Sequence, residues 1–519
     1  MRTFIYLILF IFIFCSDILA QRSEKNTVEK TPKTVFEKTS LIGLKFRSIG
    51  PAQTSGRVSD FAVNPNNFKE YYVAVASGGV WKTVNAGTTY KSVFDKAASY
   101  SIGCITMDPN NSNVIWVGTG ENNNQRSVPY GDGVYKSIDG GESWKNMGLK
   151  SSEHIGKILV DPNNSDIIYV AAIGPLWSSG GDRGVYKSVN GGKTWRLMLG
   201  IDADTGINDL IMDPRDSKVI YAAAYQRRRH VFTYLGGGPG SGLHKSVDGG
   251  ATWIEINKGL PEVDMGRIGM AMAPSDPEVI YAIVEASEGK SGFFMSTNRG
   301  ASWKKQGNYS TSGNYYQEIV VDPKDAQTVY AMNTWIQVSH DGGKTFKVLG
   351  ETTKHVDNHC MWIDPTDSEH FLVGCDGGIY ESWDRAKTWH YKPNLPVTQF
   401  YKVALDNAYP FYHVYGGTQD NASLGGPSRS LSDNGISNEE WINTHGGDGF
   451  ETQVDQKNAN IIYAQSQHGV LVRYDRLSGE ELGIQPQPRK DENAYRWNWD
   501  APLVISNHDN KRLYFAANK

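Results

Sequence analysis

The sequence has little cysteine: four residues among 519, one of which, Cys15, lies in an apolar stretch near the N-terminus. The other three, Cys104, Cys360 and Cys375, have no regular spacing and do not form the disulfide framework typical of small secreted domains. One bridge, between Cys360 and Cys375, is compatible with the sequence. Because 39% of the residues are apolar, we expect the fold to be stabilised mainly by its core.

The sequence also lacks a strong charge of either sign and a long apolar run beyond its N-terminus. Its net charge of −4 gives no basic surface for nucleic acid. The apolar run at residues 4–14 follows Arg2 and precedes the small residue Ala20, which predicts a signal peptide at 1–20 with cleavage before Gln21. An uncleaved anchor is the alternative. We therefore expect a linker at 21–40 and an exported mature chain without a membrane span, located in the periplasm, on the cell surface or in the medium.

A short phrase rich in glycine, acid and aromatic residues recurs along the chain. Its pattern is Ser/Thr-x-Asp/Asn-x-Gly-x-Ser/Thr-aromatic, and the seventh copy has Ala386 in place of the glycine. An apolar strand with an Asp-Pro or Asn-Pro turn precedes each copy, as in "ILVDPNNSDIIYVAA" (158–172). Each unit therefore predicts four short antiparallel strands, and such units repeated radially predict an all-β propeller. The acid or amide positions of the phrase are Asn85, Asp139, Asn190, Asp248, Asn298, Asp341 and Asp384.

The repeat also predicts the domain organisation. The seven copies end at Trp389, and three more units follow that match the repeat less closely and lack the phrase. We expect one seven-bladed propeller at 41–394 and, at 395–519, about two and a half blades of an incomplete second propeller. Because the last unit stops after its second strand, we expect the chain to be part of a longer protein. A single ten-bladed ring is the alternative.

The repeated phrase is interpreted as a structural turn between the third and fourth strands of a blade. Its Asp or Asn accepts hydrogen bonds from turn amides, its glycine permits a positive φ, and its aromatic residue packs between blades. A catalyst needs one site rather than seven equivalent turns. The long, unequal loops between second and third strands lie on the opposite face, so we expect function there. These loops span 118–133, 172–184, 224–242 and 416–441.

Candidate ligand-binding residues lie on these loops and at the starts of the first strands. In "HVDNHCMW", His355, Asp357 and His359 alternate, so a strand would point all three the same way. Such a set suits a divalent metal, but a hydrogen-bonded channel wall is the favoured interpretation, and no metal or cofactor is predicted. The other candidates are Arg57, Glu121, Arg126, Trp177, Arg228, Tyr234 and His445.

Three aspartates in glycine-rich stretches are candidates for catalysis. Asp376 lies in "GCDGGIY", Asp420 in "GGTQDN" and Asp448 in "HGGDGF". A pair of acids across a groove, one with a raised pKa, is the machinery of glycoside hydrolysis. The alternative interpretation of each is an Asx-turn residue beside glycine.

These motifs carry a resemblance to known families. The repeated phrase resembles the Asp-box, or BNR repeat, of the sialidase-like propeller superfamily. From 41 to 519 the chain resembles bacterial exported proteins with a sortilin-like N-terminal propeller region, and also xyloglucanase-type glycoside hydrolases with two facing seven-bladed propellers. The second resemblance implies a catalytic aspartate on the first blade, where this sequence has Ser77 in "ASGGVWKT".

Two functions follow as hypotheses. The first is an exported binding propeller that recognises a glycan or peptide on its loop face. The alternative is a xyloglucanase-like glycoside hydrolase acting on β-glucan with paired aspartates, so whether the protein is an enzyme stays open. A scaffold for secretion or surface assembly is a third interpretation, and the sequence does not predict an oligomeric state.

Overall fold

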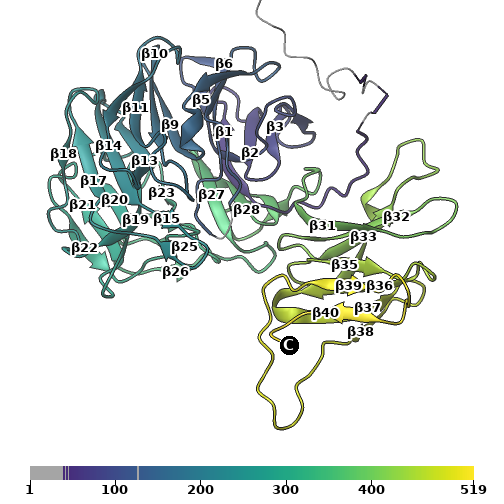
Figure 1. Ribbon diagram of the computed structural model, residues 1–519. Coiled ribbons are helices and arrows are strands. Elements are labelled where there is room, and N and C mark those ends of the chain that lie inside the picture. The colour runs from purple at the N-terminus through teal and green to yellow at the C-terminus, as the bar shows by residue number, and fades with distance from the viewer. Residues whose placement is uncertain (1–38, 41–42, 45, 126–127) are drawn as a thin grey trace, which may run out of the picture. The chain divides into compact units, whose positions relative to one another are not determined.

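Antiparallel β-strands make up nearly all of the regular structure in this computed structural model, which describes residues 39–519 apart from 41–42, 45 and 126–127 (Figure 1). The predicted signal peptide, the linker as far as residue 38, and Arg126 lie outside the described residues. In the part that is described, no helix is long and apolar enough to span a bilayer. Residues Ile49–Lys519 form one compact unit.

The first three sheets each have four strands joined in sequence order. The first contains β1 (Val58–Val63), β2 (Tyr71–Val75), β3 (Gly79–Thr83) and β4 (Lys91–Ser92). The second contains β5 (Ile102–Asp108), β6 (Asn111–Thr119), β7 (Val134–Ser137) and β8 (Lys145–Gly148). The third contains β9 (Ile155–Asp161), β10 (Asn164–Ala172), β11 (Gly184–Ser188) and β12 (Arg196–Leu199), preceded by the short 3-10 helix η1 (Lys150–Ser152).

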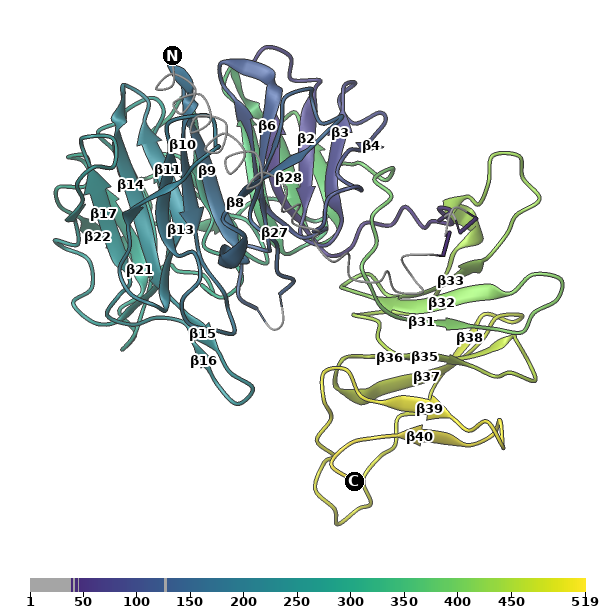
Figure 2. The same ribbon diagram turned by 45° about the horizontal axis from the view of Figure 1, so that its top comes forward.

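The fourth sheet carries an insertion between its second and third strands. It contains β13 (Thr205–Asp213), β14 (Asp216–Gln226), β17 (Gly242–Ser246) and β18 (Ile254–Glu255). The inserted hairpin projects beyond the sheet (Figure 2) and consists of β15 (Arg228–Arg229) and β16 (Tyr234–Leu235).

Three more four-stranded sheets complete the first group. The fifth contains β19 (Met265–Met272), β20 (Ile280–Ala286), β21 (Gly292–Ser296) and β22 (Lys304–Gly307). The sixth contains β23 (Ile319–Val321), β24 (Val329–Ala331), β25 (Gln337–Ser339) and β26 (Lys347–Val348). The seventh contains β27 (Asn358–Asp364), β28 (Asp367–Cys375), β29 (Gly378–Ser382) and β30 (His390–Tyr391).

Two further four-stranded sheets and one two-stranded sheet follow. The eighth contains β31 (Phe400–Leu405), β32 (His413–Thr418), β33 (Ser423–Pro427), η2 (Asn438–Glu440) and β34 (Ile442–His445). The ninth contains β35 (Thr452–Val454), β36 (Ile461–Ser466), η3 (Gln467–Gly469), β37 (Val470–Asp475) and β38 (Glu480–Gly483). The last pair is β39 (Leu503–Ile505) and β40 (Leu513–Phe515).

The hydrophobic core shows where the ring closes. Apolar clusters lie between each pair of successive sheets from the first to the seventh. A further cluster joins Val58 and Val73 of the first sheet to Leu372 and Ile379 of the seventh. Because the seventh sheet packs on the first, this ring has seven blades rather than ten. The all-β propeller is therefore observed, and two four-stranded sheets and one two-stranded sheet follow its ring. The domain boundary at 394/395 and the incomplete second propeller stay predictions.

The repeated phrase forms a uniform hydrogen-bonded turn between the third and fourth strands. In the fourth sheet, Asp248 Oδ1 accepts from Ser246 Oγ at 2.8 Å and from the Thr252 amide at 2.9 Å, while Ser246 Oγ accepts from the Gly250 amide at 2.8 Å. Equivalent side-chain bonds occur at Asn85, Asp139, Asn190, Asn298, Asp341 and Asp384. The aromatic residue that ends the phrase links neighbouring blades, as where the Trp195 indole donates to the Met147 carbonyl at 2.8 Å.

The bridge between Cys360 and Cys375 that the sequence allowed is absent, and both residues are buried free thiols. Their strands are adjacent, but Cys360 pairs with Gly374 rather than with Cys375. Since successive side chains alternate between the two faces of a strand, the two sulfurs lie on opposite faces of the sheet. The Cys360 thiol donates to the Val58 carbonyl and the Cys375 thiol to the Gly378 carbonyl.

Candidate functional site

A buried carboxylate, Asp376, is the centre of a polar cluster where the ring closes. It lies in the turn between β28 and β29 and is 1% exposed. Its Oδ2 accepts from the Tyr315 hydroxyl at 2.5 Å, and its Oδ1 lies 2.7 Å from His359 Nε2 and 3.5 Å from Arg57 Nε. Arg57 also pairs with Glu121, which is 1% exposed. Residues from four blades thus meet around one carboxylate.

The surroundings of Asp376 favour its ionised form. Burial alone would raise the pKa, but His359, a hydrogen bond from Asp420 and the Arg57 guanidinium together hold the pKa of Asp376 well below its usual range. Asp376 is therefore an anion held by its neighbours.

Asp420 has the opposite protonation preference. Burial, its hydrogen bond to Asp376 and the negative charges of Asp376 and Asp448 raise the pKa of Asp420 well above the ordinary value. Asp448 is 5% exposed and accepts from the Gln467 side-chain amide at 2.7 Å. The three aspartates predicted for catalysis are thus electrostatically linked, and Asp420 is the one whose pKa is raised.

The backbone at this cluster is strained. Arg57, Asp357 and Asp420 have φ values of 69°, 61° and 60°, in the left-handed region that side chains other than glycine rarely adopt. Such conformations persist only where surrounding contacts hold them, and they concentrate at functional sites.

A pocket of about 240 Å³ opens beside Arg57 and Glu121. One side is aromatic: the rings of Tyr401 and Phe450 stack with centroids 5.1 Å apart, and Phe450 meets Trp499 edge-on at 6.3 Å. The remaining lining residues, most of them polar, are Gln125, Val128, Pro129, Gln399, Gln419 and Asp500. Rings next to amides and charged groups fit a ligand with both apolar faces and hydroxyl edges.

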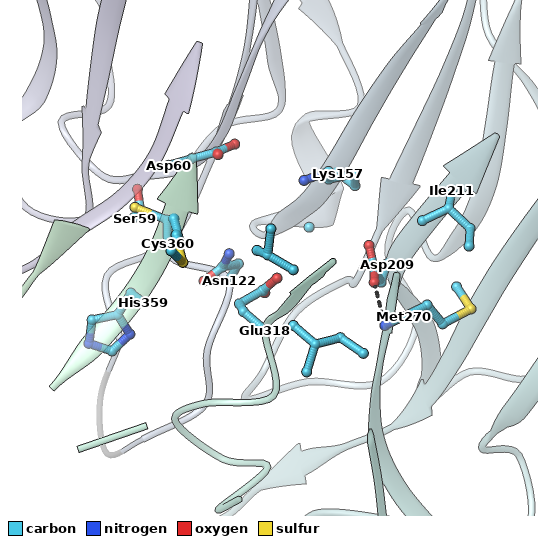
Figure 3. A pocket seen from close by; sticks show the side chains of 14 residues that line it. Ser59, Asp60, Asn122, Lys157, Asp209, Ile211, Met270, Glu318, His359 and Cys360 are labelled. Carbon is cyan, nitrogen blue, oxygen red and sulfur yellow. Dashed lines mark hydrogen bonds between the residues drawn. The ribbon is translucent and has the colours of Figure 1, made fainter. Parts of the chain in front are cut away.

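A second cavity, of about 130 Å³, lies among the first strands of the blades (Figure 3). Lys157 lies between Asp60 and Asp209, and their charges raise the pKa of its ammonium group against the effect of burial. Asp209 accepts from the Met270 amide of the next blade at 3.0 Å, and Asp60 accepts from the Ile105 amide at the same distance. These acids bridge adjacent first strands, so the cavity wall is part of the blade packing.

The predicted alternation of His355, Asp357 and His359 was wrong. The strand β27 begins only at Asn358, and the positive φ of Asp357 breaks the period of two. His355 Nδ1 lies against the Val356 carbonyl and Asp357 accepts from Tyr316, while His359 faces Asp376. Within the described ranges, no group of three or more His, Cys, Asp or Glu residues is arranged to hold a metal ion.

The other predicted ligand residues lie away from the Asp376 cluster. Arg228 pairs with Asp204, and the Tyr234 hydroxyl bonds that of Tyr225, both at the fourth blade's insertion. Trp177 is 46% exposed on the third blade's loop. His445 lies at the end of β34.

Sequence reasoning missed the aromatic side of the pocket. Tyr401 lies in β31, and Trp499 precedes β39, in stretches without the repeated phrase. The only signal in the sequence was the clustering of aromatic residues in "QFYK" and "RWNWD". Ser77, at the position where the resemblance implied a first-blade acid, lies in the turn between β2 and β3.

The fold and the pocket define a β-propeller with a polar and aromatic cavity beside buried carboxylates. No family model matches the sequence. The chain is 25% identical over 371 residues to a xyloglucanase of Hypocrea jecorina, covering 69% of this chain and 38% of that protein. It is 25% identical over 311 residues to a xyloglucanase of Paenibacillus sp, covering 58% of this chain and 26% of that protein. The chain thus spans well under half the length of these curated relatives.

Solved structures share the fold. The GH74 enzyme of Niastella koreensis superposes with a TM-score of 0.59 at 16% identity, covering 85% of this chain and 68% of that one. The GH74 xyloglucanase of Xanthomonas campestris superposes with a TM-score of 0.52 at 13% identity, covering 90% of this chain and 87% of that one. PorZ, a surface component of the type-IX secretion system of Porphyromonas gingivalis, also superposes with a TM-score of 0.52, at 12% identity. The match covers 91% of this chain and 57% of that one. The protein is therefore a propeller similar to glycoside hydrolases, with weak sequence similarity to xyloglucanases.

Proposed function

We propose that the protein is an exported propeller that binds a β-glucan chain in the pocket beside Arg57 and Glu121. The observation that carries this proposal is the composition of the pocket wall. Tyr401 and Trp499 are half-buried and offer ring surface, the buried Phe450 supports them from behind, and Gln399 and Gln419 line the pocket beside them. Sugar rings present apolar C–H faces and hydroxyl edges, so they match such a wall better than a peptide backbone does.

A glycan array combined with a peptide library tests this proposal directly. The purified chain should bind xyloglucan or related β-glucan oligosaccharides and not the peptides. Binding to peptides alone would contradict the choice of ligand. Sequencing the N-terminus of the mature protein would test export, which predicts a first residue at Gln21.

Hydrolysis is the second candidate, and the burial of Asp420 beside Asp376 and Asp448, which raises its pKa, is the feature that favours it. A general acid of a glycosidase needs a raised pKa. Asp376 is unsuited as its partner, because the two carboxyls are hydrogen-bonded, whereas the acids of a glycosidase stand roughly 5–9.5 Å apart. Asp448 is then the partner carboxylate, acting as base or nucleophile.

Release of reducing sugar from xyloglucan tests this second candidate. Asp420→Asn and Asp448→Asn should each abolish the release, while the exposed Asp433→Asn should not change it. Full activity in the first two variants would remove these acids from the reaction.

A further inference from the structure

A hydroxyl, an imidazole and a carboxylate lie in series in the eighth and ninth sheets. The Ser466 hydroxyl, at the end of β36, is 3.0 Å from His445 Nε2, and His445 Nδ1 is 3.2 Å from Glu481 Oε1 in β38. Ser466 is 7% exposed, and the side chains of His445 and Glu481 are 11% and 45% exposed. Both distances are within the range of hydrogen bonds that activate a nucleophile.

The order of these groups sets their roles. With its proton on Nδ1, the neutral imidazole donates to Glu481, and its Nε2 then accepts from the Ser466 hydroxyl. This arrangement makes His445 the base for Ser466, and Glu481 holds the ring in the required tautomer. It depends on geometry and not on chain order, which differs among unrelated folds.

The backbone at Gly446 and Gly447 lies next to Ser466. At Gly447, whose φ is +79°, a Cβ would lie 3.1 Å from Ser466 Cβ and 2.6 Å from Gln467 Oε1. At Gly446 a Cβ would meet no atom within 4 Å outside its two neighbours in the chain, so there is open space at that backbone position. The His445-Gly446-Gly447 stretch therefore passes directly beside the Ser466 side chain.

We propose that Ser466, His445 and Glu481 form a hydrolytic site for carboxylic esters with a short acyl group. Ser466 Oγ adds to the ester carbonyl carbon while its proton passes to His445 Nε2. The C–O bond to the leaving group then breaks, and the alcohol leaves with that proton, so that the acyl group stays on Ser466. Water adds next, giving its proton to His445, and the acid departs as the Ser466 hydroxyl is restored. This chemistry is independent of glycan binding and needs no reactant besides water.

Active-site labelling of the full-length protein tests the proposal. A fluorophosphonate should modify Ser466, as mapped by peptide mass spectrometry, and p-nitrophenyl acetate should be hydrolysed with a burst of product. Ser466→Ala and His445→Ala should lose hydrolysis. Glu481→Gln should lower kcat at least about tenfold with little change in KM, because Glu481 positions the base.

Exposed residues of the same sheets and of the β39–β40 turn provide matched controls. Ser478→Ala and His508→Ala should keep both labelling and hydrolysis. Labelling at another serine, no labelling or hydrolysis by the folded wild type, or wild-type hydrolysis by Ser466→Ala would each overturn the proposal. If Ser466→Ala does not fold, the labelling map of the wild type decides alone.

Discussion

The carboxyl groups of Asp376 and Asp420 shift each other's pKa in opposite directions, lowering that of Asp376 and raising that of Asp420. Asp376 comes from the seventh blade and Asp420 from the turn after β32, in the eighth sheet. The Asn421 side-chain amide strengthens this connection, donating to the carbonyls of Thr54 and Asp376 at 2.7 and 3.2 Å. The closing blade and the eighth sheet are therefore connected through Asn421 and through the interaction of these two carboxyl groups.

Removing the charge of Asp376 should destabilise the folded protein strongly. In Asp376→Asn, Arg57 and His359 lose the anion they face inside a buried cluster. Breaking a buried pair in this way costs about 3–5 kcal/mol of unfolding free energy. Urea unfolding measures the loss, and Asp367→Asn, at the exposed first residue of β28, should change little. Equal stability of the two variants would contradict a central role for the Asp376 charge.

Replacing Asp420 should change how stability depends on pH. Because the folded pKa of Asp420 is raised, its contribution is fully present below the unfolded pKa of about 3.9 and is lost as pH rises toward the folded pKa. Asp420→Asn removes this loss, so the variant should gain stability relative to wild type between pH 4.5 and pH 8. Thermal midpoints across that range check the prediction, with Asp433→Asn as control. A stability difference that does not vary with pH would contradict the proton assignment.

The acid position of the repeated turn should tolerate replacement by Asn but not by Ala. Asn occupies the same position in three of the copies, and it can accept the same two bonds as Asp. Asp248→Asn should therefore stay close to wild type, while Asp248→Ala should lower the thermal midpoint by a few degrees, because the Thr252 amide and hydroxyl lose their acceptor. Hydroxyl and amide bonds also lower the pKa of Asp248 to about 2, so its contribution is lost only as pH falls toward that value. Equal thermal midpoints for Asp248→Asn and Asp248→Ala would show that the side-chain hydrogen bonds of Asp248 do not contribute to stability.

The propeller could be predicted from the sequence because its signals are local. A turn such as that at Asp248 needs only the residues within a few positions of it, and the phrase repeats in every blade of the first ring. Ring closure at the seventh blade also followed from where the phrase stops, at Trp389.

The site was harder to predict because it joins distant segments. The separation between Arg57 and Trp499 in the sequence gives no hint that both line one pocket. The alternation of His355, Asp357 and His359 suggested three metal ligands on one face of a strand. It fails because Asp357 has a left-handed backbone conformation and precedes the strand. The glycine-rich stretches made Asp376 and Asp420 candidates for catalysis, which stays a prediction, but only the fold shows that their pKa values shift in opposite directions.

Binding of xyloglucan oligosaccharides, measured by calorimetry, tests the glycan-binding account most directly. Trp499→Ala should weaken binding about five- to thirtyfold, because a lost ring contact of this size is worth roughly 1–2 kcal/mol. Trp383→Ala, a 55% exposed tryptophan in the repeated turn of the seventh blade, should bind as the wild type does. An unchanged affinity in Trp499→Ala, or an equal loss in Trp383→Ala, would contradict the assignment of the ligand to this pocket.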